Sequence, residues 1–468
     1  MLRKFLAVGA LSLATAASAL AQDTDIARIR EEFNELRDRY EKRIESLEKR
    51  LAEAESRSAR GEPAPMKAEP AAPAAAARST DSAFNPAISL ILEGTLSGAS
   101  RDPNQYQITG FVPSGGEVGP PKRGFGLAET ELVMSANIDP YFRGLVIAAL
   151  APEGGIGVEE AYVQSLSLPL GFTAKGGRFF SALGYLNEQH QHAWDFQDVP
   201  LPYRAFLGGK LRHDGIQLKW VAPTDLFLEL GAELSAGDQF PGNDRNKSGI
   251  GGSAIFGHAG GDIGASLAWR AGASFVRASA GARSYEDTDA LGGSVTNSFT
   301  GNSRLWALDA VIKWAPNGNA KQTNFKLQGE YLRLKQDGEL AYNDTAQPAP
   351  QFGAPFRDYL RAVQSGWYVQ GVWQFHPRWR VGYRHDVLRY GRVNIGIVEN
   401  GLGPGAADFP VLAPYSPKRN TLMFDFNPSE FSRLRLQYAL DNSRIGAADR
   451  QWLLQYIHSL GAHGAHQF

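Results

Sequence analysis

Residues 365–390 read SGWYVQGVWQFHPRWRVGYRHDVLRY, and this stretch decides the fold class. In its first half, large apolar side chains at Trp367, Val369 and Trp373 alternate with polar side chains such as Gln370 and Gln374. A period of two residues indicates a strand with one apolar and one polar face. The pair at 376–377, His-Pro, interrupts the pattern, and a second strand is predicted from 379 to 390.

The same alternation recurs along the chain from position 84 onward. It predicts sixteen strands, at 86–97, 125–138, 141–151, 156–167, 171–181, 213–222, 226–236, 251–260, 265–280, 303–315, 323–336, 365–375, 379–390, 419–427, 432–441 and 449–460. These strands are about as long as a tilted strand that crosses a bilayer.

The connections between these strands alternate between tight turns and longer segments. Pairs such as Asp139-Pro140, Gly261-Asp262 and His376-Pro377 form the tight turns, whereas most of the other connections are long and rich in Gly, Pro, Asn and Asp. A soluble β-sandwich would also alternate, but it would have shorter, evenly spaced strands. Tight turns on one side and long loops on the other are typical of outer-membrane barrels. The predicted fold is therefore an all-β, 16-stranded antiparallel transmembrane β-barrel.

The N-terminus predicts export. Arg3 and Lys4 precede an apolar run to Leu20, and the small residues at 19 and 21 form a cleavage site, so residues 1–21 are predicted to be a signal peptide. An uncleaved membrane anchor is the alternative. The expected location is the bacterial outer membrane, with outer-membrane lipid around the barrel.

Residues 22–56 are predicted to form an α-helical coiled coil in the periplasm. Apolar residues from Ile26 to Ala54 recur at steps of three and four, which is a heptad pattern. So short a helix implies self-association as a homo-oligomer, with a trimer expected; a lone amphipathic helix on the barrel or on another partner is the alternative. Residues 57–83 then form a Pro/Ala-rich linker, and 84–468 the barrel.

The composition of the chain argues against several classes of function. The chain of 468 residues has 51 Gly, 0 Cys and a net charge of -1, and its mean hydropathy is -0.29. The absence of cysteine excludes a disulfide scaffold, and the charge argues against a nucleic-acid partner. No nucleophile motif of an enzyme is present, so an enzyme is not expected.

Two resemblances follow from short segments. Residues 159–163 (EEAYV) and 176–180 (GGRFF) resemble the barrel core of the phosphate-selective porin superfamily. Residues 184–190 (GYLNEQH), 194–196 (WDF) and 459–466 (SLGAHGAH) resemble proteobacterial proteins often labelled TonB-dependent or zinc-regulated outer-membrane receptors. The second resemblance implies a link to zinc. TonB-dependent receptors have 22 strands and a plug, and the predicted sixteen strands fit a porin better.

The long connection 182–212 is the predicted constriction loop, because a loop at this position narrows the lumen in sixteen-strand porins. It carries Glu188, His190, His192, Asp195, Asp198 and Arg204. His190, His192 and Asp195 together could bind Zn²⁺. The alternative is a polar loop that hydrogen-bonds the wall and shapes the field of the pore. His463 and His466 form a second candidate pair of metal ligands near the C-terminus.

Strand parity predicts which charged residues line the pore. Glu129, Glu131 and Glu160 lie on early strands, and the basic residues lie on late ones, at Arg380, Arg384, Arg433 and Arg435. Opposed walls of this kind would create a transverse field. Because no basic ladder stands out, specific phosphate transport is not expected.

The predicted function is a porin-like channel for small hydrophilic solutes or ions. Two alternatives remain open: a zinc-linked uptake receptor that uses the loop histidines, and a structural tether from the outer membrane to peptidoglycan through the coiled coil. Apart from the Zn²⁺ considered above, no cofactor is expected.

Overall fold

A computed structural model describes residues 86–115, 118–150, 154–344 and 355–461. All of them belong to the second of two units of the chain, Thr80–Phe468. The predicted signal peptide, coiled coil and linker, together with His463 and His466, lie outside the described residues.

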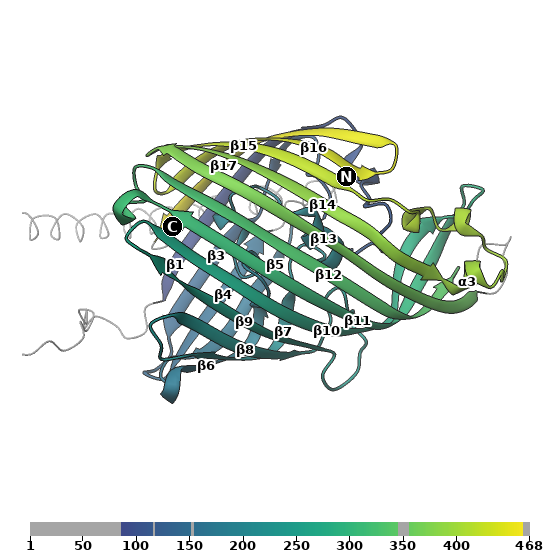
Figure 1. Cartoon of the computed structure of the whole chain (residues 1–468), viewed down its shortest axis with the longest axis horizontal. Helices are drawn as coiled ribbons and strands as arrows, with labels where there is room; N and C mark the ends of the chain where they lie inside the picture. Colours follow the sequence, from purple (N-terminus) through teal and green to yellow (C-terminus); the bar gives the residue numbers. More distant parts are fainter. Residues whose placement is uncertain (1–85, 116–117, 151–153, 345–354, 462–468) are drawn as a thin grey trace, which may run out of the picture. The chain divides into compact units, whose positions relative to one another are not determined.

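The described residues form strands β1 to β17 (Figure 1). Their bounds are β1 Ala87–Ala99, β2 Gly124–Leu127, β3 Thr130–Asn137, β4 Phe142–Leu150, β5 Ile156–Ser165, β6 Phe172–Phe180, β7 Arg212–Val221, β8 Phe227–Ser235, β9 Gly252–Ile263, β10 Leu267–Thr288, β11 Ser294–Trp314, β12 Asn324–Tyr342, β13 Phe356–His376, β14 Trp379–Ile395, β15 Lys418–Ser429, β16 Ser432–Arg444 and β17 Ala447–Gly461.

These segments form a closed barrel of sixteen strands, as predicted. Both β2 and β3 pair with β1, so they are two pieces of one strand that is interrupted at positions 128–129. Each later strand pairs antiparallel with the next one along the chain, and β17 pairs with β1 through a register that runs from Ser89–Gly461 to Ala99–Gln451. Closure leaves the sheet without an exposed edge.

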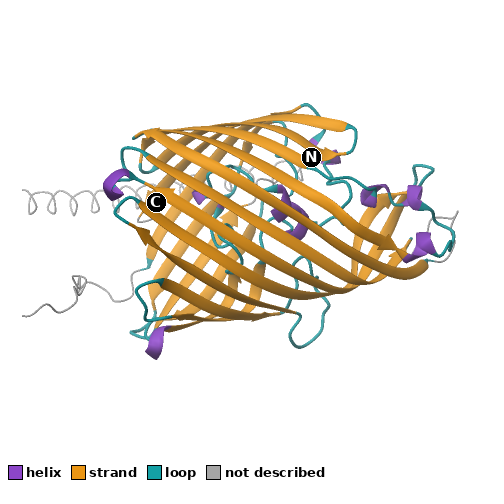
Figure 2. Cartoon of the chain, viewed as in Figure 1, coloured by secondary structure: helices purple, strands orange, loops and turns teal. Residues whose placement is uncertain are grey.

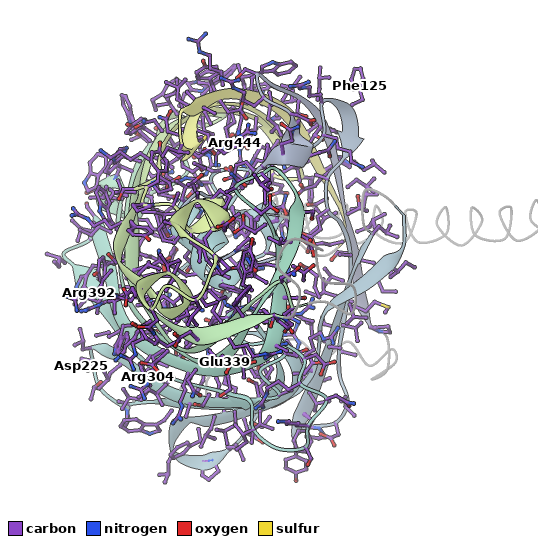
Figure 3. All side chains as sticks on the ribbon, turned by 90° about the vertical axis from the view of Figure 1, so that its right-hand side faces the viewer. Phe125, Asp225, Arg304, Glu339, Arg392 and Arg444 are labelled. Atoms are coloured by element: carbon purple, nitrogen blue, oxygen red, sulfur yellow. The ribbon has the colours of Figure 1, made fainter. Side chains whose placement is uncertain are left out.

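The faces of the strands follow the predicted parity. On β13, Val369 and Trp373 are 43% and 50% exposed on the outside, whereas Tyr368 and Gln370 on the inside are 0% and 3% exposed. The end-on view shows apolar side chains projecting outward from the wall, with Phe125 among them (Figure 3). An apolar exterior around a polar interior is the surface of a barrel embedded in a membrane.

No helix in the described part of the chain combines the length and the apolar character that a helical membrane span requires.

Strands β10 to β14 are longer than predicted, with 22, 21, 19, 21 and 17 residues. About ten residues suffice to cross a bilayer, so these strands continue beyond it on the side of the long loops (Figure 2). A cluster of buried side chains, including Phe299, Leu340, Tyr342 and Phe409, supports this extension. The residues around it are rich in Gly, Asn and Asp and therefore read as loops; packing between distant segments overrides this local preference.

The helices are short. In the described ranges they comprise α2 (Leu201–Leu207) and α3 (Gly396–Glu399), with six 3-10 turns at 103–105, 169–171, 191–193, 316–318, 406–408 and 410–412. Of these, α2 and the turn at 191–193 belong to the connection between β6 and β7, the predicted constriction loop.

Candidate functional site: a loop inside the barrel

The connection between β6 and β7, residues 181–211, lies inside the barrel and is called the inner loop below. Its base is closed by Asn187, whose amide nitrogen donates to the carbonyls of Ser181 and Leu211 at 2.8 Å each. The carbonyl oxygen of Asn187 accepts from the backbone N–H of Leu211, also at 2.8 Å. Because both ends are held by one buried side chain, the loop enters and leaves the wall at a fixed place.

One face of the inner loop is apolar and packs on the barrel wall. Helix α2 begins after Pro200 and ends at Gly208, whose φ of 64° is the left-handed conformation that glycine adopts easily. The buried side chains of this helix and of the rest of the loop contact inward-facing apolar residues of β10 to β14. This cluster includes Leu186, Leu201, Tyr203, Phe206, Val276, Leu305, Leu332 and Tyr368. The hydrophobic effect therefore fixes the loop against this part of the wall.

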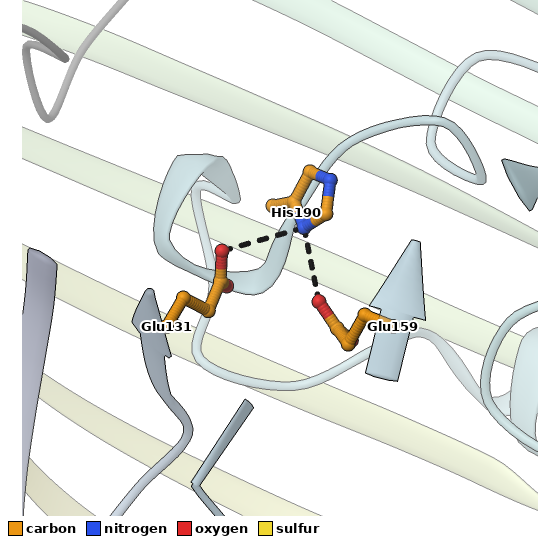
Figure 4. Close-up of side chains that lie close together, drawn as sticks. All are labelled: Glu131, Glu159 and His190. Carbon is orange, nitrogen blue, oxygen red and sulfur yellow. Dashed lines mark hydrogen bonds and ion pairs between the residues drawn. The ribbon is translucent and has the colours of Figure 1, made fainter. Parts of the chain in front are cut away.

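A second face carries histidines and meets acidic residues of β3 and β5. His190 Nδ1 lies 3.1 Å from Glu159 and 3.4 Å from Glu131 (Figure 4). On the other side of the ring, His190 Nε2 lies 2.8 Å from Glu160. His192 Nδ1 lies 3.1 Å from the other oxygen of Glu131. Burial alone would lower the pKa of His190, but the hydrogen bonds to the three carboxylates raise it well above its ordinary value.

A β-bulge brings two successive glutamates to this face. Ile147 of β4 pairs with Glu160 and Ala148 pairs with Val158, so Glu159 has no partner in the ladder. An extra residue of this kind redirects the side chains of its strand. Glu159 consequently contacts His190 together with Glu160, although strict alternation would place Glu159 on the opposite face.

The third face of the inner loop carries aspartates and meets a basic wall. Asp198 forms ion pairs with Arg204 of the loop, with Arg419 of β15 and, at 2.9 Å, with Arg384 of β14. Burial alone would raise the pKa of Asp198, but Arg419, Arg384 and Arg204 hold it far below its usual range. All three arginine side chains are at most 2% exposed. Removing one partner of such a buried ion pair costs several kcal/mol of stability, because the other charge stays buried without a partner.

Asp195 is bound separately on the same wall. It pairs with Lys326 of β12 and, at 3.2 Å, with Arg380 of β14. Burial alone would raise the pKa of Asp195, but Lys326 and Arg380 outweigh it and bring the pKa to about 2. Its carboxylate therefore does not join the histidines, and the predicted grouping of His190, His192 and Asp195 differs from the one in the structure.

Asp425 of β15 organises the remaining arginines. Arg435 lies 2.9 Å and Arg433 3.7 Å from its carboxylate, and Arg380 also pairs with it. Both Arg433 and Arg435 also donate to the backbone carbonyl of Trp194 in the inner loop. The arginines thus bind the loop through its backbone as well as through its aspartates.

The structure places every described candidate residue on the inner loop or on the wall around it. Glu188 lies apart from the two histidines and from Asp195 and Asp198, and pairs with Lys219 at 3.0 Å. Glu129 adjoins Glu159. Sequence reasoning missed Arg419 and Asp425, which the parity of the strand 419–427 identifies as inward-facing. It also missed Glu159, for which no local signal exists because the bulge depends on pairing with β4.

Comparisons with known proteins give one similar sequence and several similar structures. An uncharacterized protein of Aquifex aeolicus is 29% identical, over 83% of this chain and 81% of its own length. No family model matches the chain.

Outer-membrane proteins are among the similar structures. They include the loop L8 deletion mutant of OmpT of Vibrio cholerae (12% identity, TM-score 0.48, covering 80% of this chain and 99% of that one). The outer membrane channel DcaP of Acinetobacter baumannii has 12% identity and a TM-score of 0.44, over 80% and 97% of the two chains. An anion-selective porin from Comamonas acidovorans has 10% identity and a TM-score of 0.46, over 80% and 99%.

Proposed function

We propose that this protein is an outer-membrane channel for small hydrophilic solutes and ions, with the inner loop as its constriction. The observation that carries the proposal is the position of this loop. It crosses the interior of a membrane-embedded barrel and carries aspartates toward the basic wall and histidines toward the acidic one. A loop held in this way narrows the lumen without depending on a bound partner.

Several charged side chains at the loop and wall retain contact with water. The side chains of Lys326 and Arg380 are each 16% exposed on the basic side, and His190, Glu159 and Glu160 are 14%, 14% and 10% exposed on the acidic side. Solutes that pass the loop would therefore meet charges of both signs, in a transverse arrangement. This arrangement favours polar solutes over apolar ones and gives no basic ladder for phosphate.

Planar-bilayer conductance of the purified protein tests the proposal. We expect stepwise conductance, and we expect Arg380→Gln to shift the reversal potential in a salt gradient toward cation selectivity, because it removes a positive charge from the lumen. Arg357→Gln is the matched control: Arg357 is 49% exposed and pairs with Glu339 and Asp344 in the strand extension. No conductance steps from folded protein, or equal reversal potentials for Arg380→Gln and wild type, would contradict the proposal.

We also infer that the protein forms a homo-oligomer through the predicted heptad segment at 22–56. The mass of the detergent-solubilised complex, measured for the full chain and for a variant that lacks 22–56, tests this. Equal masses would contradict the role of this segment.

A further inference from the structure

Three potential metal-ligand atoms converge where the inner loop meets β3 and β5. His190 Nδ1 lies 3.4 Å from Glu131 Oε2 and 3.1 Å from Glu159 Oε2, and the ligand atoms of this group all lie within 4.8 Å of one another (Figure 4). Zinc bonds to nitrogen and oxygen of about 2.0–2.1 Å place the corners of a tetrahedron about 3.3 Å apart. The distances of 3.1 Å and 3.4 Å from His190 Nδ1 to the two glutamate oxygens lie on either side of this value.

Glu131 supplies a buried oxygen that is directed into this group. Its side chain is 1% exposed, and within the described chain Oε2 forms no hydrogen bond shorter than its 3.4 Å ion pair with His190 Nδ1. The other oxygen, Oε1, is occupied by His192 at 3.1 Å. A buried carboxylate oxygen whose donor lies this far away is poorly satisfied, and a cation between Glu131 and His190 would bind it more closely.

The surroundings hold these side chains in the way that metal ligands are held. His190 Nε2 contacts Glu160 Oε2 at 2.8 Å, and the backbone N–H of Phe180 donates to Glu160 Oε1 at 3.1 Å. A metal-bound histidine usually donates its second N–H to a carboxylate, which orients the ring and makes the bonding nitrogen more basic. Glu160 occupies that position, so Nδ1 is the nitrogen that is directed toward Glu131 and Glu159.

We propose that His190, Glu131 and Glu159 bind one divalent first-row transition cation, such as Zn²⁺, with water completing the coordination. One imidazole and two carboxylates suit this class better than Ca²⁺ or Mg²⁺, which prefer oxygen alone. Binding forms the bond from Nδ1 to the metal and releases the proton that Nδ1 carries. The site stands whether or not the barrel conducts. It differs from the set predicted from sequence because Glu131 and Glu159 take the places of His192 and Asp195 beside His190.

Titration of the mature full-length protein in detergent with Co²⁺ tests the site, with visible absorption as the readout. We expect one saturable equivalent of Co²⁺ that Zn²⁺ displaces. Glu131→Gln and Glu159→Gln each remove a charged ligand and should weaken binding more than a hundredfold. Glu160→Gln removes only the orienting contact and should weaken it roughly 10- to 100-fold. The heat-dependent gel mobility of each variant establishes that the barrel is folded.

Two controls make the outcome decisive. His258 pairs with Glu229 at 3.0 Å but belongs to no group of three ligands in the described chain, so His258→Gln should leave Co²⁺ binding unchanged. A variant with His463→Ala and His466→Ala should also bind as wild type does. Absence of saturable binding by the wild type, binding that survives Glu131→Gln in a folded barrel, or binding lost with the terminal histidines would each overturn the proposal.

Discussion

Replacing Asp195 by Asn tests whether the ion pairs on the basic wall hold the inner loop in the lumen. The drop in the pKa of Asp195 from 3.8 to about 2 corresponds to about 2 kcal/mol of loop docking at neutral pH. Asn keeps the shape of the side chain but loses this charge interaction with Lys326 and Arg380. We therefore expect the loop to leave its docked position roughly thirty times more often.

The absence of cysteine from the chain provides the assay, because a single introduced cysteine is a unique reporter. Ala205 is 4% exposed within the docked loop, so Ala205→Cys should react with a thiol reagent only after the loop opens. In this background, Asp195→Asn should accelerate labelling roughly thirtyfold at pH 7. Asp225→Asn, in the exposed turn before β8, is the matched control and should not alter the rate.

The pH dependence of this effect has a defined sign. Because the pKa of Asp195 is depressed in the folded protein, its contribution is complete above about pH 4 and is lost as the pH falls toward about 2. The difference between Asp195→Asn and the parent should therefore disappear over that interval, with labelling read by a reagent that is active in acid. Equal labelling rates at pH 7, or a difference that persists at pH 2, would refute the reasoning.

Two further substitutions concern the start of the inner loop. Glu233→Gln weakens the hydrogen bonds that the carboxylate accepts from the Ser181 hydroxyl at 2.6 Å and the Ala182 N–H at 2.9 Å. Urea unfolding in micelles should show that the free energy of unfolding falls by about 1–3 kcal/mol, and an unchanged midpoint would contradict this. Gly184→Ala places a Cβ 2.2 Å from a carboxylate oxygen of Glu330, at a backbone φ of +67°. Because the left-handed conformation alone costs about 1–2 kcal/mol, we expect labelling of the Ala205→Cys reporter to become faster by tenfold or more. An unchanged labelling rate would show that the loop has room to adjust.

The sequence predicts the barrel wall well because its signal is local. Alternation with a period of two residues and tight turns such as His376-Pro377 depend only on neighbouring positions, and they identify sixteen strands and the inward parity of Glu131, Glu160 and Arg384. The extension of β10 to β14 is underestimated because its stability comes from packing between distant residues such as Phe299 and Phe409.

The pairing of charges across the lumen is decided only by the tertiary structure. The sequence identifies the loop 182–212 and its His and Asp residues, but closing the barrel determines which wall each of them meets. Asp195 lies 130 residues or more from Lys326 and Arg380 along the chain, and Glu159 joins His190 only because a bulge forms against β4. Local patterns encode which face a side chain occupies; electrostatic partners depend on distances in space, which exist only once the sheet has closed around the loop.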